Sequence, residues 1–204
     1  MDHRYAILID GGFFTRKLKQ RLNKTPDVDD VLHAIDELKE NELLSGFELL
    51  RTYYYDAYAA SGKVKHPVTK QTVNLAETDV FTRNKAFLQK LELQPNISLR
   101  AGELSPRGYK LNYRVMHQDD LASRPLEEKD FMLDIEQKGV DLRIGLDIDR
   151  LSLRQMVRTI VVVTGDSDFI PAFKFARREG VRVILAHMDH GVKRELKAHT
   201  DGFI

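Results

Sequence analysis

The chain has 204 residues, of which 42% are hydrophobic and 31% are charged, with a net charge of +1 and no cysteine. A chain of this length can bury a hydrophobic core that needs no disulfides. The lack of cysteine excludes thiolate metal sites and thiol nucleophiles. The apolar run before Asp10 is too short for a signal peptide or a membrane span, so we expect a cytoplasmic protein with no membrane partner.

The predicted elements alternate between strand and helix from the N-terminus to residue 104. The first strand is an apolar run that is typical of a strand buried on both faces. Strands are expected over 5–9, 47–55 and 97–104, helices over 13–22, 27–44 and 77–93, and a mobile basic loop near 61–76.

The rest of the chain continues this alternation after an insertion near 105–125 that we cannot place. Its clearest strand is TIVVVT, which is followed by Gly165 and two aspartates. Helices are expected over 126–138, 141–158, 169–179 and from 192, and strands over 159–164 and 181–186. The alternation predicts an α/β fold with a mainly parallel sheet in a single domain over 1–204.

Acidic residues follow two of the most apolar strands. Asp10 ends the first strand, and Asp166 and Asp168 follow the strand over 159–164. If these strands are neighbours, the acids share one crevice at the carboxyl edge of the sheet, where they need a proton, a basic partner or a cation. Carboxylate oxygens suit Mg²⁺ or Mn²⁺. The alternative is structural: a turn at Asp10, and a helix cap at Ser167 or Asp168.

The sequence lacks the motifs of other active sites that lie at the carboxyl edge of such a sheet. The chain has no P-loop, no G-x-G-x-x-G after a strand and no G-x-S-x-G nucleophile elbow. A receiver-like signalling domain remains a distant option because Asp56 follows the second strand. The other acids and the lysine that such a domain needs are missing.

Three segments carry a family resemblance: LIDGGFF near the start, QKGVDLRIGLD in the middle and VVVTGDSDFIPAFKFARREGVRVILA near the end. Together they resemble the NYN domain, in particular the bacterial LabA-like branch of the PIN-like nuclease superfamily. The resemblance implies a three-layer α/β/α sandwich with a PIN-like (Rossmannoid) sheet that cleaves RNA with Mg²⁺ or Mn²⁺.

The same resemblance assigns the site residues. Asp10, Asp141, Asp166 and Asp168 match the family's catalytic and metal-binding acids. Asp147 matches a further acid, six residues after Asp141. Six residues at about 100° each turn it away from Asp141 on a helix, so we expect it to support the site or the fold.

Charge patterning indicates where RNA would bind. Residues 61–118 carry 10 basic and 4 acidic residues, residues 119–149 carry 4 and 10, and residues 150–197 carry 10 and 5. Basic side chains beside the crevice would contact the phosphates of single-stranded RNA. The candidates are Lys63, Lys65, Lys70, Arg83 and Lys85, and Tyr53, Tyr54, Tyr55 and Tyr58 offer a stacking surface, although alternation along a strand favours core packing for the first three.

One departure from the family leaves a second function open. Gly12 and Phe13 stand where the family often has an asparagine shortly after the first aspartate. The missing polar side chain favours an RNA-binding or regulatory module that keeps the fold and cleaves poorly. The sequence does not fix the oligomeric state, and a homodimer is kept as an option.

Overall fold

The computed structural model describes residues 3–117 and 124–204, and these form two compact units. The first unit contains the chain as far as Asp56, together with Phe87–Ala101 and Gly139–Ile204. The second contains Ala57–Ala86 and Gly102–Lys138. The sequence predicts one domain, and the second unit is built largely from the two stretches that this prediction treats as a loop and an insertion.

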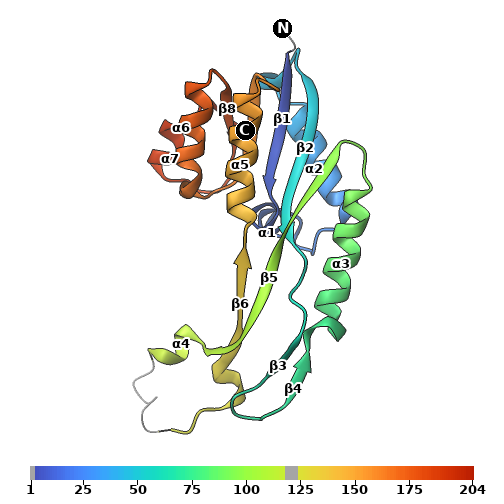
Figure 1. The fold of residues 1–204 in the computed structure, drawn as a ribbon, viewed down its shortest axis with the longest axis vertical. Helices are drawn as coiled ribbons and strands as arrows, with labels where there is room; N and C mark the ends of the chain where they lie inside the picture. The colour runs from blue at the N-terminus through green and yellow to red at the C-terminus, as the bar shows by residue number, and fades with distance from the viewer. Residues whose placement is uncertain (1–2, 118–123) are drawn as a thin grey trace. The chain divides into compact units, whose positions relative to one another are not determined.

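The main sheet is mixed and mostly parallel, with helices on both sides, as the α/β/α prediction requires (Figure 1). Its strands are hydrogen-bonded in the order β6-β5-β2-β1-β7-β8-β9. β1 is parallel to both β2 and β7, and β8 is parallel to β7 and β9. The strands are β1 (Arg4–Asp10), β2 (Glu48–Ala57), β5 (Ile97–Leu111), β6 (Phe131–Lys138), β7 (Thr159–Val163), β8 (Arg182–Ala186) and β9 (Gly202–Phe203).

The two central strands, β1 and β7, are mostly apolar because both of their faces are covered. Five consecutive residues of β1 and all five of β7 are buried. Their register sets Ile9 opposite Val163, and Asp10 opposite Tyr55 of β2. The carboxyl ends of β1, β2 and β7 therefore lie side by side, as expected if the first strand and the strand over 159–164 are neighbours.

Helices follow most of these strands. The helix expected over 27–44 ends earlier, at Lys39, and a separate 3₁₀ turn, η1 (Glu42–Leu44), follows it. The helices of the chain are α1 (Gly11–Leu22), α2 (Val28–Lys39), α3 (Asp79–Glu92), α4 (Tyr113–Met116), α5 (Val140–Leu153), α6 (Ile170–Arg178) and α7 (Arg194–Ala198).

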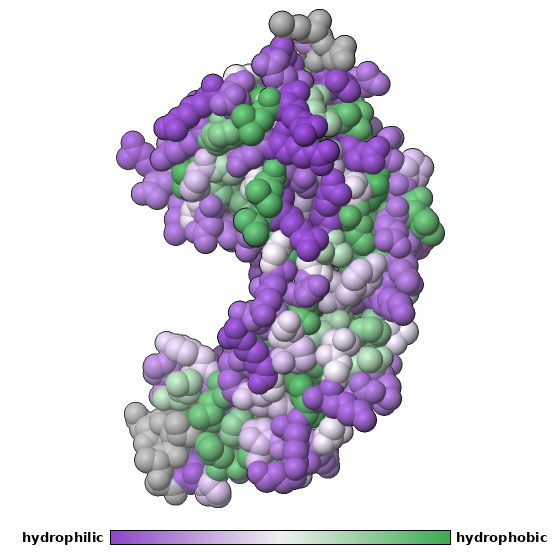
Figure 2. All heavy atoms as spheres, in the orientation of Figure 1, coloured by the Kyte–Doolittle hydropathy of each residue, from purple (hydrophilic) through white to green (hydrophobic). Residues whose placement is uncertain are grey.

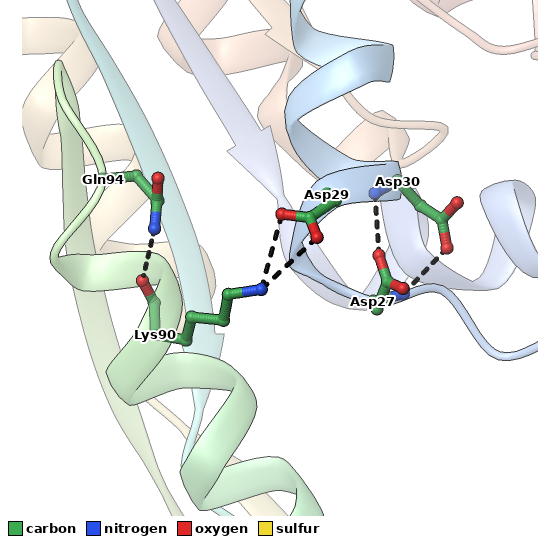
Figure 3. A network of polar contacts seen from close by, with 5 residues as sticks. All are labelled: Asp27, Asp29, Asp30, Lys90 and Gln94. Atoms are coloured by element: carbon green, nitrogen blue, oxygen red, sulfur yellow. Dashed lines mark hydrogen bonds and ion pairs between the residues drawn. The ribbon is translucent and has the colours of Figure 1, made fainter.

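The start of α2 is fixed by a capping box (Figure 3). Asp27 accepts the backbone N–H of Asp30 at 2.9 Å, and Asp30 accepts that of Asp27 at 3.0 Å. Beside the box, the Lys90 ammonium of α3 lies 3.4 Å from both carboxylate oxygens of Asp29. This contact ties the C-terminal half of α3 to α2 within the first unit.

The second unit has its own small core and corrects two predictions. The segment near 61–76 is an antiparallel hairpin of β3 (Lys63–Lys65) and β4 (Thr72–Asn74), followed by the turn η2 (Leu75–Glu77), and not a loop. Residues 131–138 form strand β6, and not part of a helix over 126–138. The core packs Ala60, Val64 and Leu75 against Leu104, Tyr109 and Leu133.

Both errors arise because strand pairing, which the local sequence does not reveal, decides these elements. The three-residue strands β3 and β4 leave little periodicity to detect. The mixed composition of β6 is compatible with a helix when its partner is unknown. Pairing with β5, from Glu103 opposite Lys138 to Leu111 opposite Phe131, decides its conformation. The basic and acidic stretches also meet here, because Lys110 pairs with Asp134 at 2.7 Å and Arg107 with Glu136 at 2.5 Å.

Candidate active site at the carboxyl edge of the sheet

The first candidate acid, Asp10, is the last residue of β1 and the N-cap of α1. Its Oδ1 accepts the backbone N–H of Phe13 at 3.0 Å, and its Oδ2 accepts the Thr164 hydroxyl at 3.4 Å. Burial raises the pKa of Asp10, with a further increase from the charge of Asp141 and opposing contributions from the Phe13 N–H and from Arg16. The alternative of a turn at Asp10 is wrong, because Gly11 and Gly12 are the first residues of α1, which Asp10 caps.

Asp166 is the corresponding residue after β7. It caps the short 3₁₀ helix η4 (Ser167–Phe169), where its Oδ1 accepts the N–H of Asp168 at 2.9 Å. The sequence assigns the cap to Ser167 or Asp168, and this is wrong because the turn begins one residue earlier. Asp168 is exposed within η4, with its side chain available to solvent.

Asp141 is the second residue of α5, and Gly139, with a φ of 77°, is the N-cap of this helix. Its side chain is exposed, yet its pKa is raised by burial of the carboxyl and by the charges of Asp166 and Asp168. Since Asp141 also acts on the pKa of Asp10, it is electrostatically coupled to acids from both strand ends. These charge effects connect Asp141 with Asp10, Asp166 and Asp168, and the role of the four acids as one metal site stays a prediction.

The donor set suits a hard divalent cation, which carboxylates bind through oxygen. Within residues 3–117 and 124–204, however, no three His, Asp or Glu side chains are grouped closely enough to hold one ion together. Mg²⁺ keeps several of its waters and uses one or two carboxylates, so two of these acids together with water would be sufficient ligands.

Asp147 has a different environment. Its Oδ2 accepts the Tyr55 hydroxyl at 2.8 Å and lies 3.2 Å from Nε of Arg100. The side chain is 16% exposed. Hydrogen bonding to the ionised Asp147 and burial both raise the pKa of Tyr55, with burial the larger effect.

The five basic residues that the sequence proposes for RNA binding all belong to the second unit, whereas the four acids belong to the first. Lys63 and Lys65 are exposed on β3, and Lys85 is exposed on α3. Lys70 donates to the carbonyl of Pro67 at 2.6 Å, and Arg83 forms an exposed pair with Asp79 at 3.6 Å. Tyr53, Tyr54 and Tyr55 are buried, as core packing requires.

Sequence reasoning missed Thr164, which connects two of the acids. This buried hydroxyl donates to Asp10 and accepts the backbone N–H of Asp166 at 3.1 Å. Its place directly before the G-D-S-D motif was the available signal. Arg16, one turn and a half along α1, was missed because its effect on Asp10 depends on helix geometry.

Two glycines permit close packing at the site. A Cβ on Gly11 would lie 2.7 Å from Cε1 of Tyr54 and 2.7 Å from the carbonyl oxygen of Tyr55. A Cβ on Gly165 would lie 2.6 Å from Cδ2 of His190. His190 therefore covers the backbone between Thr164 and Asp166, and no sequence signal pointed to it.

Comparison with known proteins agrees with this architecture. The family model described as the NYN domain matches residues 4–204. A solved structure of a protein of unknown function from Vibrio parahaemolyticus RIMD 2210633 is 15% identical, with a TM-score of 0.52. That likeness covers 100% of this chain and 92% of the other, and it concerns the fold alone. No curated protein matches the sequence.

Proposed function

Since this chain belongs to the NYN domain family, we propose that it is a metal-dependent ribonuclease that hydrolyses RNA phosphodiester bonds. NYN domains belong to the PIN-like nuclease superfamily, whose members typically use divalent metals. The observation that carries the proposal is that the Thr164 hydroxyl bonds both to Oδ2 of Asp10 and to the backbone N–H of Asp166, which holds the acids at the ends of β1 and β7 beside each other. The raised pKa of Asp141, caused by burial and by the charges of Asp166 and Asp168, agrees with it. Acids gathered in this way are costly unless a cation or a proton balances them.

In this proposal Asp10 and Asp166 hold Mg²⁺ or Mn²⁺, with Asp168 and Asp141 as the further acids of the site. When bound, such an ion neutralises charge that develops on the phosphate and lowers the pKa of a bound water. The Thr164 hydroxyl keeps the Asp10 carboxylate oriented. In the same proposal Asp141, an exposed carboxylate whose pKa is raised by burial and by the charges of Asp166 and Asp168, accepts the proton of the attacking water.

Single-stranded RNA is the proposed substrate, with phosphate contacts from Lys63, Lys65, Lys70, Arg83 and Lys85. Replacing Lys63, Lys65 and Lys70 together with glutamine should weaken RNA binding and flatten its dependence on salt, because fewer counterions are released. An unchanged salt slope would show that these lysines are only a solvated surface.

A second candidate function is a module of the same fold that binds or regulates RNA with little cleavage. One observation favours it: Gly12 carries no side chain, and Phe13 is buried, so neither offers a polar group beside Asp10.

Membership of the LabA-like branch and a cytoplasmic location are also part of the proposal. No helix within the described ranges is long and apolar enough to cross a membrane.

The homodimer remains a prediction, and α5 supplies its candidate surface. Leu142, Leu146 and Leu153 are 67%, 57% and 61% exposed, and they lie on the side of α5 opposite its buried residues. Figure 2 shows hydrophobic surface over α5 on a face that is otherwise mostly hydrophilic. Such a stripe is typical of an interaction site.

Asp10→Asn tests the nuclease proposal most directly. The amide keeps the cap of α1 but removes the charge that a hard cation needs, so Mn²⁺- or Mg²⁺-dependent cleavage of single-stranded RNA should fall at least 100-fold. Asp36→Asn, at an exposed aspartate of α2, is the matched control and should cleave normally. A wild-type chain that binds RNA without cleaving it would favour the binding module instead.

A further inference from the structure

A cavity of about 390 Å³ lies between α1, α2 and the segment after β8. Its floor consists of Phe14, Ala34, Leu38 and Ala186, all of which are buried. Small-molecule sites have this size and combine apolar walls with a few polar groups. None of the residues proposed above for metal or phosphate binding lines it.

The rim of the cavity is polar. Lys17 and Gln20 extend from α1, and Asp189 comes from the segment after β8. Arg21 and Glu37 also reach the rim, but they pair with each other at 2.9 Å. An ammonium, an amide and a carboxylate offer both donors and acceptors, which is what the edge of a nucleobase needs.

Two elements lead from the acids to this cavity. On α1, Asp10 caps the helix and Phe14 lines the cavity four residues later, a rise of about 6 Å. In the segment after β8, Asp189 walls the cavity, and the next residue, His190, covers Gly165 and packs on Phe13 with ring centroids 5.5 Å apart. The cavity therefore adjoins the catalytic edge along both elements.

The backbone of this segment is strained where it passes from cavity to site. Met188 and Asp189 have φ values of 49° and 55°, in the left-handed region that favours glycine. The turn is held by the His190 N–H, which donates to the His187 carbonyl at 2.8 Å. Glycine would relieve this strain, so side chains at these positions point to a role for them in lining the cavity.

We propose that this cavity binds a nucleobase, namely that of an RNA nucleotide whose phosphate lies at the acids. The apolar floor packs against the base, and Lys17, Gln20 and Asp189 contact its edge. The inference rests on the proposed function for its RNA source, whereas a free nucleotide would present the same base chemistry.

Calorimetric titration of the full chain with 5′-mononucleotides tests the proposal, with ribose 5-phosphate as the probe that lacks a base. Mononucleotides should bind at least 10-fold more tightly than ribose 5-phosphate. Ala34→Phe fills the cavity and should reduce that binding at least 10-fold. Lys17→Gln and Asp189→Asn change only the rim and should weaken it several-fold, which keeps the test valid if Ala34→Phe does not fold.

Lys19→Gln is the matched control, because this exposed residue of α1 does not line the cavity. The proposal would be overturned if mononucleotides bound equally to the wild type and to the rim variants. It would also be overturned if the wild type bound ribose 5-phosphate as tightly as it binds mononucleotides. Mononucleotides that bind without displacing an RNA oligonucleotide would overturn its RNA source.

The Asp10→Asn chain separates this proposal from the nuclease proposal. It should lose cleavage but keep the difference in affinity between mononucleotides and ribose 5-phosphate, since that difference depends on the base and Asp10 does not line the cavity. Ala34→Phe that cleaves RNA at the wild-type rate would contradict the cavity proposal and leave the nuclease proposal standing. If the wild type does not cleave RNA but binds mononucleotides, and Ala34→Phe removes that binding, the nuclease proposal is contradicted and the cavity proposal stands.

Discussion

The hydroxyl of Thr164 donates a hydrogen bond to Oδ2 of Asp10 at 3.4 Å. These residues are 154 positions apart in sequence, and they meet because β1 and β7 are adjacent parallel strands. The same hydroxyl oxygen accepts the N–H of Asp166, so one buried side chain orients an acid from each strand end.

We predict that Thr164→Val weakens metal binding without disrupting the sheet. Loss of a residue that orients a ligand typically costs about 10-fold in metal affinity. The Asp166 N–H also loses its acceptor, which should lower the free energy of unfolding by about 1 kcal/mol. Mn²⁺ titration followed by calorimetry measures the first effect, and Thr164→Ser should restore most of it. Wild-type affinity in Thr164→Val would contradict a positioning role.

The raised pKa of Asp10 predicts how Asp10→Asn changes stability with pH. The unfolded chain ionises this carboxyl at a lower pH than the folded chain does, so wild-type stability declines as pH rises from the ordinary carboxyl range through the raised pKa. Asparagine removes that decline. Without metal, the variant should match the wild type in acid and melt at an equal or higher temperature at neutral pH. A lower melting temperature there would mean that the charge of Asp10 stabilises the fold.

Asp147→Ala should destabilise the first unit rather than remove a metal ligand. It leaves the buried Tyr55 hydroxyl without its acceptor and Arg100 without its partner, at a cost of roughly 1–3 kcal/mol. The rise in melting temperature on adding Mn²⁺ should remain. Tyr55→Phe, which removes one of the two contacts, should show a smaller loss. If Asp147→Ala instead keeps its stability and loses the Mn²⁺ effect, Asp147 belongs to the metal site.

Asp130 should make the second unit sensitive to acid. The Arg124 guanidinium donates to both oxygens of this buried carboxylate at 2.6 and 2.9 Å and, with the Glu127 N–H, holds its pKa at about 2. A lowered pKa gives stability that is present above the unfolded value of 3.8 and lost as pH falls toward 2. Amide exchange at Asn112, whose N–H donates to the Asp130 carbonyl, should therefore accelerate over that range. Asp130→Asn should exchange fast already at neutral pH.

Leu146→Glu tests the predicted homodimer. A carboxylate in the middle of the exposed leucine stripe of α5 should abolish self-association, which light scattering after size-exclusion chromatography measures directly. Val80→Glu is a suitable control, because Val80 of α3 is also an exposed hydrophobic residue. A wild-type monomer at all concentrations would remove the dimer, and a dimer that survives Leu146→Glu would place the interface elsewhere.

The parallel core of the sheet was predictable because β1, β7 and β8 are mostly apolar and alternate with helices. Asp10 and Asp166 follow from that pattern, since parallel strands end at the same edge. Asp141 required the resemblance to a family, because nothing in its own helix distinguishes it from an ordinary first-turn aspartate.

The second unit was not predictable because its order depends on pairings between distant residues. Val64 and Leu133 contribute to one small core although 69 positions separate them. Lys110 and Asp134 read as parts of a basic and an acidic stretch, yet they neutralise each other across two strands. The cavity and His190 also depend on tertiary geometry, since two left-handed residues turn the segment after β8.

The borders between the two units fall inside regular elements rather than in linkers. Three of them interrupt β2 after Asp56, α3 after Ala86 and β5 after Ala101, and the fourth directly follows β6. Proteases cleave most readily in exposed linkers, and three of these four borders lie instead in hydrogen-bonded backbone. The second unit cannot be excised as one fragment or expressed as one continuous piece, because it consists of two chain segments that are separated by Phe87–Ala101 of the first unit. A truncation that keeps the first unit must remove both segments and join Asp56 to Phe87 and Ala101 to Gly139.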